Sequence, residues 1–266
     1  MGARAAGAVV LVAAWAIAGC GGSSERDRVR SYIDSANHVE AGAGPALQRA
    51  NGVYSQFSKG KLPQSTAIAD LARAEDVIRG LRARLSRLRP PPAARALHRQ
   101  LLRVLDLNVE MARESTELAI YLPDARAALA AVGAINTSLR ARLAASSTAP
   151  GQGAALGRYR RSLARVVGRL QRLSPPPILA ATHAAQITRL QTAGRLARKL
   201  TAAVQARDAP LVARLLLRFR RVNASGAGDK ALTSEEIRSY DTRYGLIGEA
   251  TAQLRREEAR LQRTLG

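Results

Sequence analysis

The chain has little of three kinds of residue: cysteine, aromatic and acidic. With one cysteine in 266 residues, no disulfide can form within the chain and no cluster of thiolates can bind a metal. Aromatic residues make up only 3% of the sequence, and runs of strand-forming residues are absent after residue 20. Alanine and leucine dominate instead, which predicts an all-α protein.

Acidic residues are outnumbered two to one, because 20 Asp and Glu stand against 42 Lys and Arg, for a net charge of +22. A basic surface can bind nucleic acid through phosphate contacts. Proteins that bind single strands also need aromatic stacking platforms, and the few aromatic residues here are scattered along the sequence. Nucleic acid is therefore not the favoured partner. Part of the arginine excess also fits a GC-rich genome, which weakens any argument from total charge.

The first twenty residues have the order of a secretory signal. Arg4 provides a positive start, and residues 5–18 form an apolar run. As a helix this run spans about 21 Å, which is short of the roughly 30 Å hydrocarbon core of a membrane. The run is therefore expected to be a signal peptide rather than a permanent membrane span.

The end of this segment, Ile17-Ala18-Gly19-Cys20, resembles the lipobox of bacterial lipoproteins. The resemblance implies cleavage before Cys20 and acylation of its thiol, with residues 1–19 as signal peptide and 20–30 as lipidated cysteine and tether. Two acyl chains anchor a protein stably to a membrane. The expected location is the outer face of the cytoplasmic membrane. A coincidental or buried core cysteine is the alternative, but the Gly-Gly-Ser-Ser stretch that follows cannot pack around a thiol.

An internal repeat occurs at a spacing of 85 residues. Leu88-Arg89-Pro90-Pro91-Pro92 is followed by His98, and Leu173-Ser174-Pro175-Pro176-Pro177 is followed by His183. This duplication predicts one helical repeat over 31–120 and a second over 121–208. The C-terminal helices, 209–266, are expected to be a partial third repeat.

Each repeat contains an apolar row with steps of three and four residues, the pattern of long packed helices. The rows are Leu71, Ala74, Ile78, Leu81, Leu85 and Leu88, and Leu156, Tyr159, Leu163, Val166, Leu170 and Leu173. The predicted fold is an extended antiparallel helical bundle built from an internally duplicated unit. Helices are expected at 25–40, 45–58, 65–88, 92–120, 124–146, 153–173, 177–206, 210–223 and 234–265. Asp124 and Asp208 are predicted N-caps, and Thr233 with Glu236 has capping-box spacing.

No motif in the sequence indicates catalysis. His98 and His183 occupy equivalent positions without a neighbouring carboxylate or thiolate, so they are expected to be packed, hydrogen-bonded histidines rather than metal ligands. Gly-x-Ser-x-Gly, Cys-x-x-Cys and His-Glu-x-x-His are all absent. We expect no enzyme activity, no cofactor and no metal, although an active site assembled from distant segments stays open.

Positive charge is concentrated in the second repeat, where residues 121–208 hold 14 basic and 2 acidic residues. Five of these basic residues lie three or four apart, so one helix would present them on one face. This arginine row is Arg158, Arg161, Arg165, Arg169 and Arg172. It is either a solvated face or a surface that docks onto anionic lipid headgroups or an anionic wall polymer.

An acidic row occupies the first repeat, and it includes Glu110 and Glu114. The equivalent positions in the second repeat are Arg195 and Lys199. We expect the two rows to face each other and to align the duplicated helices.

The proline corners followed by histidine resemble those of helical lipoproteins of GC-rich Gram-positive bacteria, a resemblance that implies no particular activity. The leading prediction is a lipid-anchored, non-catalytic envelope scaffold or interaction protein, whose partners are membrane lipid through the acylated cysteine and an anionic surface. The alternative is a helical binding protein for an apolar or amphipathic ligand. A closed seam between helices would favour the scaffold, and an open cavity would favour the ligand-binding protein.

Overall fold

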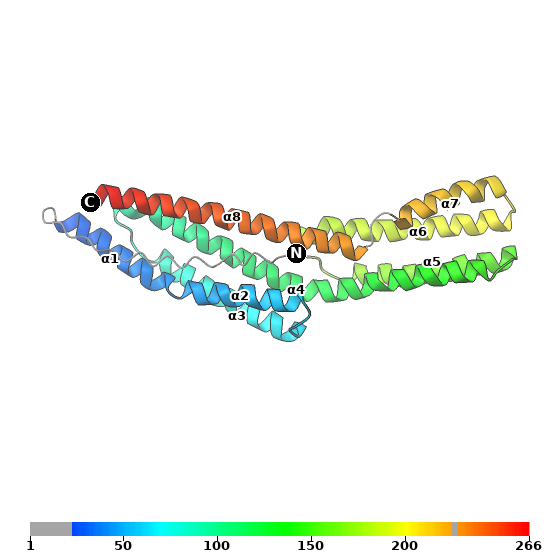
Figure 1. The fold of residues 1–266 in the computed structure, drawn as a ribbon, viewed down its shortest axis with the longest axis horizontal. Helices are drawn as coiled ribbons and strands as arrows, with labels where there is room; N and C mark the ends of the chain where they lie inside the picture. The colour runs from blue at the N-terminus through cyan, green and yellow to red at the C-terminus, as the bar shows by residue number, and fades with distance from the viewer. Residues whose placement is uncertain (1–22, 225–227, 266) are drawn as a thin grey trace. The chain divides into compact units, whose positions relative to one another are not determined.

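The computed structural model describes residues 23–224 and 228–265, and these form helices and short connections without a strand. The all-α prediction is confirmed (Figure 1). The predicted signal peptide and Cys20 lie outside the described residues. The long helices are α1 (Ser23–Glu40), α2 (Ala43–Ser58), α3 (Gln64–Ser86), α4 (Arg95–Ala144), α5 (Ala149–Gln171), α6 (Ala180–Gln205), α7 (Ala209–Ala224) and α8 (Gly228–Leu265). Short 3-10 helices η1 (Pro92–Ala94) and η2 (Pro177–Leu179) follow the proline runs.

The structure repeats at the spacing found in the sequence. Both ends of α5 lie 85 residues after the ends of α3, and η2 lies 85 residues after η1. The last proline of each run occupies the first position of its 3-10 helix, where the missing amide donor costs nothing. A helix, a proline corner and a second helix therefore recur as a unit.

The two predicted apolar rows form the buried faces of α3 and α5. Five residues of each row are at most 4% exposed: Leu71, Ala74, Ile78, Leu81 and Leu85, and Leu156, Tyr159, Leu163, Val166 and Leu170. Leu88 and Leu173, the last in each row, lie past the helix ends and are only partly buried. Burying a side chain of this size contributes about 1.5–3 kcal/mol, so these rows are main sources of stability.

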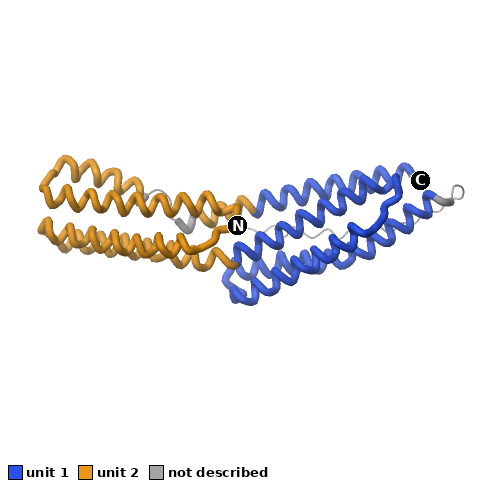
Figure 2. The backbone as a smooth tube through the Cα atoms, turned by 180° about the vertical axis from the view of Figure 1, so that it is seen from behind, with its two compact units in different colours: residues 1–119, 240–266 blue, residues 120–239 orange. Residues whose placement is uncertain are grey.

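The chain divides into two compact units, coloured separately in Figure 2. Unit 1 contains the described residues up to Ala119 together with those from Tyr240 onward, and unit 2 runs from Ile120 to Ser239. Helices α4 and α8 contribute to both units, so the C-terminal range 209–266 is shared between them. In unit 1, α1 is already packed at Val29, which is fully buried, so residues 23–30 belong to the folded unit.

The predicted break between helices at 120 and 124 is wrong, because α4 runs through this region with Pro123 inside it. Proline lacks the amide hydrogen that would bond to the carbonyl of Ala119, four residues earlier. The side-chain amide of Gln64 donates a hydrogen bond to this carbonyl instead, at 3.1 Å. Leu122 and Ala125 are buried on either side of Pro123, so packing favours a continuous helix. Asp124 is consequently an interior helical residue and not an N-cap.

Two other helix starts were predicted with mixed success. The Asp208 carboxylate accepts a hydrogen bond from the Leu211 amide at 3.0 Å, so the N-cap of α7 is confirmed. The capping box of Thr233 and Glu236 is wrong, because α8 begins at Gly228 and both residues are interior. Glu236 is buried and pairs with Arg126 of α4 at 2.8 Å.

Candidate functional site

The arginine row lies on the exposed side of α5, opposite its buried face, and its last member, Arg172, is the C-cap residue of the helix. The spacing of three and four residues keeps these side chains on one face of a regular helix, and all five are exposed. None forms an ion pair with another described residue; Arg165 alone donates a hydrogen bond, to Ser162 at 3.1 Å. Helix α5 contains no acidic residue that could neutralise the row.

A groove between α4 and α5 extends the basic surface beyond the row. It has a volume of about 400 Å³, and Arg158, Arg161 and Arg165 line it. Arg142 of α4 joins them, held by a hydrogen bond to Ser138 at 3.2 Å. The sequence spacing within α5 could not identify Arg142, because this residue belongs to α4 and reaches the groove only through the packing of the two helices. Ile135 and Leu139 supply apolar surface in the same groove, so its lining is both basic and apolar.

The two equivalent histidines each bind a tyrosine within their own unit. The Tyr32 hydroxyl lies 2.9 Å from Nδ1 of His98, and the Tyr121 hydroxyl lies 2.8 Å from Nδ1 of His183. Both pairs have edge-on rings, with centroids 5.9 and 5.7 Å apart. Burial lowers the pKa of both histidines, so each is neutral at pH 7. The expectation of packed, hydrogen-bonded histidines is therefore confirmed.

The tyrosine partners were missed by sequence reasoning. Tyr32 and Tyr121 lie 89 positions apart instead of 85, so the fixed spacing of the repeat does not align them. Burial raises the pKa of Tyr121 to about 12, which keeps its hydroxyl protonated. Among the described residues, no group of three or more His, Cys, Asp or Glu side chains could hold a metal ion.

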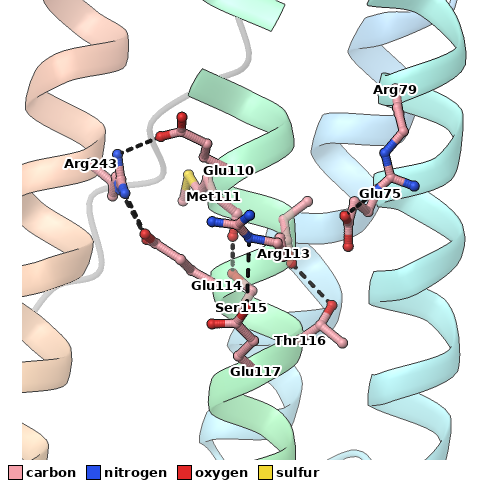
Figure 3. Close-up of polar contacts among 11 residues, drawn as sticks. Glu75, Arg79, Glu110, Met111, Arg113, Glu114, Ser115, Thr116, Glu117 and Arg243 are labelled. Carbon is pink, nitrogen blue, oxygen red and sulfur yellow. Dashed lines mark hydrogen bonds and ion pairs between the residues drawn. The ribbon is translucent and has the colours of Figure 1, made fainter. Parts of the chain in front are cut away.

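The acidic row of α4 does not pair as expected with Arg195 and Lys199. Arg243 of α8 bonds to Glu110 at 2.8 Å and to both carboxylate oxygens of Glu114, as Figure 3 shows. Farther along the same row, Asp106 pairs with Arg82 of α3 at 2.8 Å. The row therefore turns toward other helices of unit 1. The sequence spacing correctly identified a shared face but not its partners.

Four aromatic residues that are scattered in the sequence form a cluster in unit 1. Tyr54 stacks on Tyr240 with centroids 4.9 Å apart and planes at 14°, and Phe57 and Tyr244 flank this pair. Residues that are distant in the sequence are thus brought together by the packing of α2 and α8. The stacked faces of Tyr54 and Tyr240 are occupied by each other, and Tyr54 is only 5% exposed, so the cluster is a packing element.

Two carboxyl groups in unit 1 are buried enough to raise their pKa values. Burial, together with the negative charge of Glu258, raises the pKa of Glu40 from 4.5 to about 7. Burial also raises the pKa of Glu258, against the opposing effect of Arg255. Glu40 ends α1 and Glu258 belongs to α8, so this pair responds to the packing of the two helices.

Stability is expected to depend on the pH through Glu40. In the unfolded chain this carboxyl loses its proton near pH 4.5, whereas in the folded protein it keeps it to about pH 7. The folded state then binds more protons, so the free energy of unfolding falls as the pH rises through this window. Glu40→Gln removes the titrating carboxyl, so the free energy of unfolding of the variant should fall by about 1–2 kcal/mol less than that of the wild type over this pH range. The difference is this small because residual contact with water reduces the cost of burying the charged carboxylate. Urea unfolding at pH 4.5 and pH 8 measures it, and identical pH slopes for the variant and the wild type would contradict it.

One described helix, spanning 92–144, contains an 18-residue window that is apolar enough to cross a membrane, with mean hydropathy 1.4. Core helices of water-soluble proteins meet the same criteria, and 44% of this window is buried by the surrounding protein. Arg126, within the helix, pairs with Glu236 of α8.

Comparisons of the chain with protein-family models, with curated proteins and with solved structures gave no match.

Proposed function

We propose that the protein is a lipid-anchored, non-catalytic scaffold or interaction protein of the bacterial envelope, which docks its arginine row onto an anionic surface. The anchor is the acylated Cys20, at the outer face of the cytoplasmic membrane. The docking surface is an array of anionic lipid headgroups or an anionic wall polymer. The observation that carries the docking proposal is that five arginines share the exposed side of α5 without an acidic partner among the described residues.

The charges of the arginine row suit an extended anionic surface better than a single carboxylate group. Guanidinium groups remain charged at every physiological pH and form paired hydrogen bonds with phosphate oxygens. A row of such groups on one straight helix can contact several phosphates in a plane at the same time. Each basic residue near an anionic membrane contributes up to about 1 kcal/mol, and salt weakens the attraction.

The packing of α5 supports a scaffold over a protein that encloses its ligand. The row from Leu156 to Leu170 is buried, so the seam beneath the arginine row is closed. The spaces lined by α5 are open grooves at the surface. A helical binding protein is the second candidate, and the mixed basic and apolar lining of these grooves is the observation that favours it.

Sedimentation with vesicles tests the docking proposal. The mature chain from residue 20 onward, carrying Cys20→Ala, is mixed with vesicles that contain or lack anionic phosphatidylglycerol. Converting Arg161, Arg165 and Arg169 to Gln should weaken binding to anionic vesicles on the order of tenfold, because fewer charges reach the surface. The matched control converts three exposed arginines of unit 1, Arg84, Arg87 and Arg89, and so removes the same charge.

The control variant is expected to bind within about twofold of the unchanged chain, and salt should weaken binding in every case. Equal losses in the two triple variants would mean that total charge, and not the arginine row, governs docking. Equal sedimentation with neutral vesicles would also overturn the proposal.

A further inference from the structure

A second groove lies on the other flank of α5, where α5 packs against α6. Its volume of about 550 Å³ is within the range of small-molecule sites. The apolar part of its lining is Leu163, Ala164, Val167, Leu190 and Gly194. The polar part is Arg160, Arg195, Arg198, Gln171 and Gln191. We call this space the α5–α6 groove; it shares no residue with the arginine row.

The charge of the α5–α6 groove is of one sign. Arg160 comes from α5, Arg195 and Arg198 come from α6, and no acidic residue lines the groove. Arg195 donates a hydrogen bond to Thr192 at 2.7 Å, and neither of the other two guanidinium groups bonds to a described residue. Three guanidinium groups therefore border one space without a counter-charge, an arrangement that suits phosphate.

The apolar lining provides a second kind of contact in the same space. Leu163 and Leu190 are 1% exposed and Val167 is 8% exposed, so the packing of α5 on α6 fixes them as the floor of the groove. Ala164, which is exposed, and Gly194, which is half-buried, provide more accessible apolar surface. A soluble anion would use only the arginines, and a neutral apolar molecule would use only the apolar lining. A molecule with a phosphate and a hydrocarbon chain would contact both.

We propose that the α5–α6 groove binds one molecule of an anionic phospholipid. The phosphate lies against Arg160, Arg195 and Arg198, and part of an acyl chain lies along the apolar lining. This inference rests on the proposed function, because a lipid anchor at the membrane is what brings the groove within reach of phospholipids. It deepens that function by naming a specific lipid class at a site separate from the arginine row.

Gly194 allows the groove to be filled without removing a charge. It lies inside α6, and a Cβ added there meets no atom within 4 Å. Gly194→Leu therefore places its Cβ in open space at the groove and extends an apolar side chain from it, and glycine is itself a poor helix former. Gly80 is a matched control: it lies inside α3 of unit 1, and a Cβ added there also meets nothing within 4 Å.

The test titrates the mature chain carrying Cys20→Ala with dihexanoyl phosphatidylglycerol below its micelle concentration, by calorimetry. We expect saturable binding that Gly194→Leu weakens at least about tenfold and Gly80→Leu leaves within about twofold. The double variant Arg160→Gln/Arg198→Gln should also lose about tenfold, because it removes two charged contacts to the phosphate. Circular dichroism checks that each variant is as helical as the unchanged chain.

Two comparison probes distinguish a site for an anionic phospholipid from a site for a lipid without net charge or for a soluble anion. Dihexanoyl phosphatidylcholine, which has no net charge, should bind about tenfold more weakly, and inorganic phosphate should not compete at equal concentration. Unchanged phosphatidylglycerol binding in Gly194→Leu would overturn the inference, as would phosphatidylcholine binding of equal strength. Competition by inorganic phosphate alone would instead identify the site as one for a soluble anion.

The outcome separates this inference from the proposed function. Gly194→Leu is expected to sediment with anionic vesicles as the unchanged chain does, since the arginine row is intact. If vesicle docking persists and phosphatidylglycerol monomers do not bind, the groove inference fails alone. If the monomers bind and the arginine-row variant sediments normally, docking through the row fails while the groove stands.

Discussion

Replacing Cys20 with alanine is expected to abolish acylation of the protein, because the thiol is the predicted site of lipid attachment. Radiolabelled palmitate should enter the wild type in growing cells and fall to background in Cys20→Ala. Each buried methylene contributes about 0.8 kcal/mol, so two acyl chains hold a protein stably where one does not. Incorporation of the label is therefore expected to be all-or-none, whereas salt-sensitive docking through the arginine row should persist in the variant.

Ser24→Ala is the matched control, since it changes a neighbouring small residue and leaves the thiol in place. This variant should incorporate palmitate like the wild type. Mass spectrometry of the native protein should find a diacylglyceryl group on an N-terminal Cys20, with residues 1–19 removed. A bare thiol, or palmitate label that persists in Cys20→Ala, would contradict both the proposed lipid anchor and the location inferred from it.

The helices were predictable because their signals are local and repeated. The apolar rows step by three and four residues, and the proline runs end α3 and precede α6 at the expected places. Asp208 could be identified as an N-cap because its side chain bonds to an amide only three residues away. Both kinds of signal are contained within a few turns of the chain.

The wrong prediction of a helix break near Pro123 shows that proline alone does not determine where a helix ends. Proline removes one hydrogen bond from a helix, and whether the helix ends there depends on what satisfies the orphaned carbonyl. Gln64, 55 residues before Ala119, supplies the donor to the Ala119 carbonyl. The sequence around Pro123 contains no sign of this residue, so the continuous α4 could not be predicted from its own segment.

The candidate surfaces were likewise predictable only where their residues lie on one helix. The arginine row was predictable because its five members lie on one helix, whereas Arg142 and the lining of the α5–α6 groove are assembled from several helices. The acidic row of α4 was also recognised as one face, but its partner Arg243 lies 129 residues from Glu114. Periodicity identifies the residues that share a face and does not identify what that face contacts.

Arg243→Met is expected to lower the free energy of unfolding by about 2–4 kcal/mol at pH 7, because it leaves the Glu114 carboxylate without its cation. The Glu114 side chain is 10% exposed and that of Arg243 is 25% exposed, so water replaces little of the lost interaction. Removing one partner of a fully buried pair costs about 3–5 kcal/mol, and partial exposure reduces that cost here. Urea unfolding, followed by circular dichroism, measures the change.

Arg73→Met provides the matched control, because Arg73 pairs with Asp70 at 2.9 Å but its side chain is 64% exposed. This exposed pair should contribute at most about 1 kcal/mol. Neutralising the stranded carboxylate in the double variant Arg243→Met/Glu114→Gln should recover most of the loss, since an amide costs far less to bury than a charge. Equal destabilisation by Arg243→Met and Arg73→Met, or no recovery in the double variant, would mean that the contact of α8 with α4 does not depend on this ion pair. In that case the buried apolar residues of α8, Leu254 and Leu261, would have to hold its C-terminal half in unit 1.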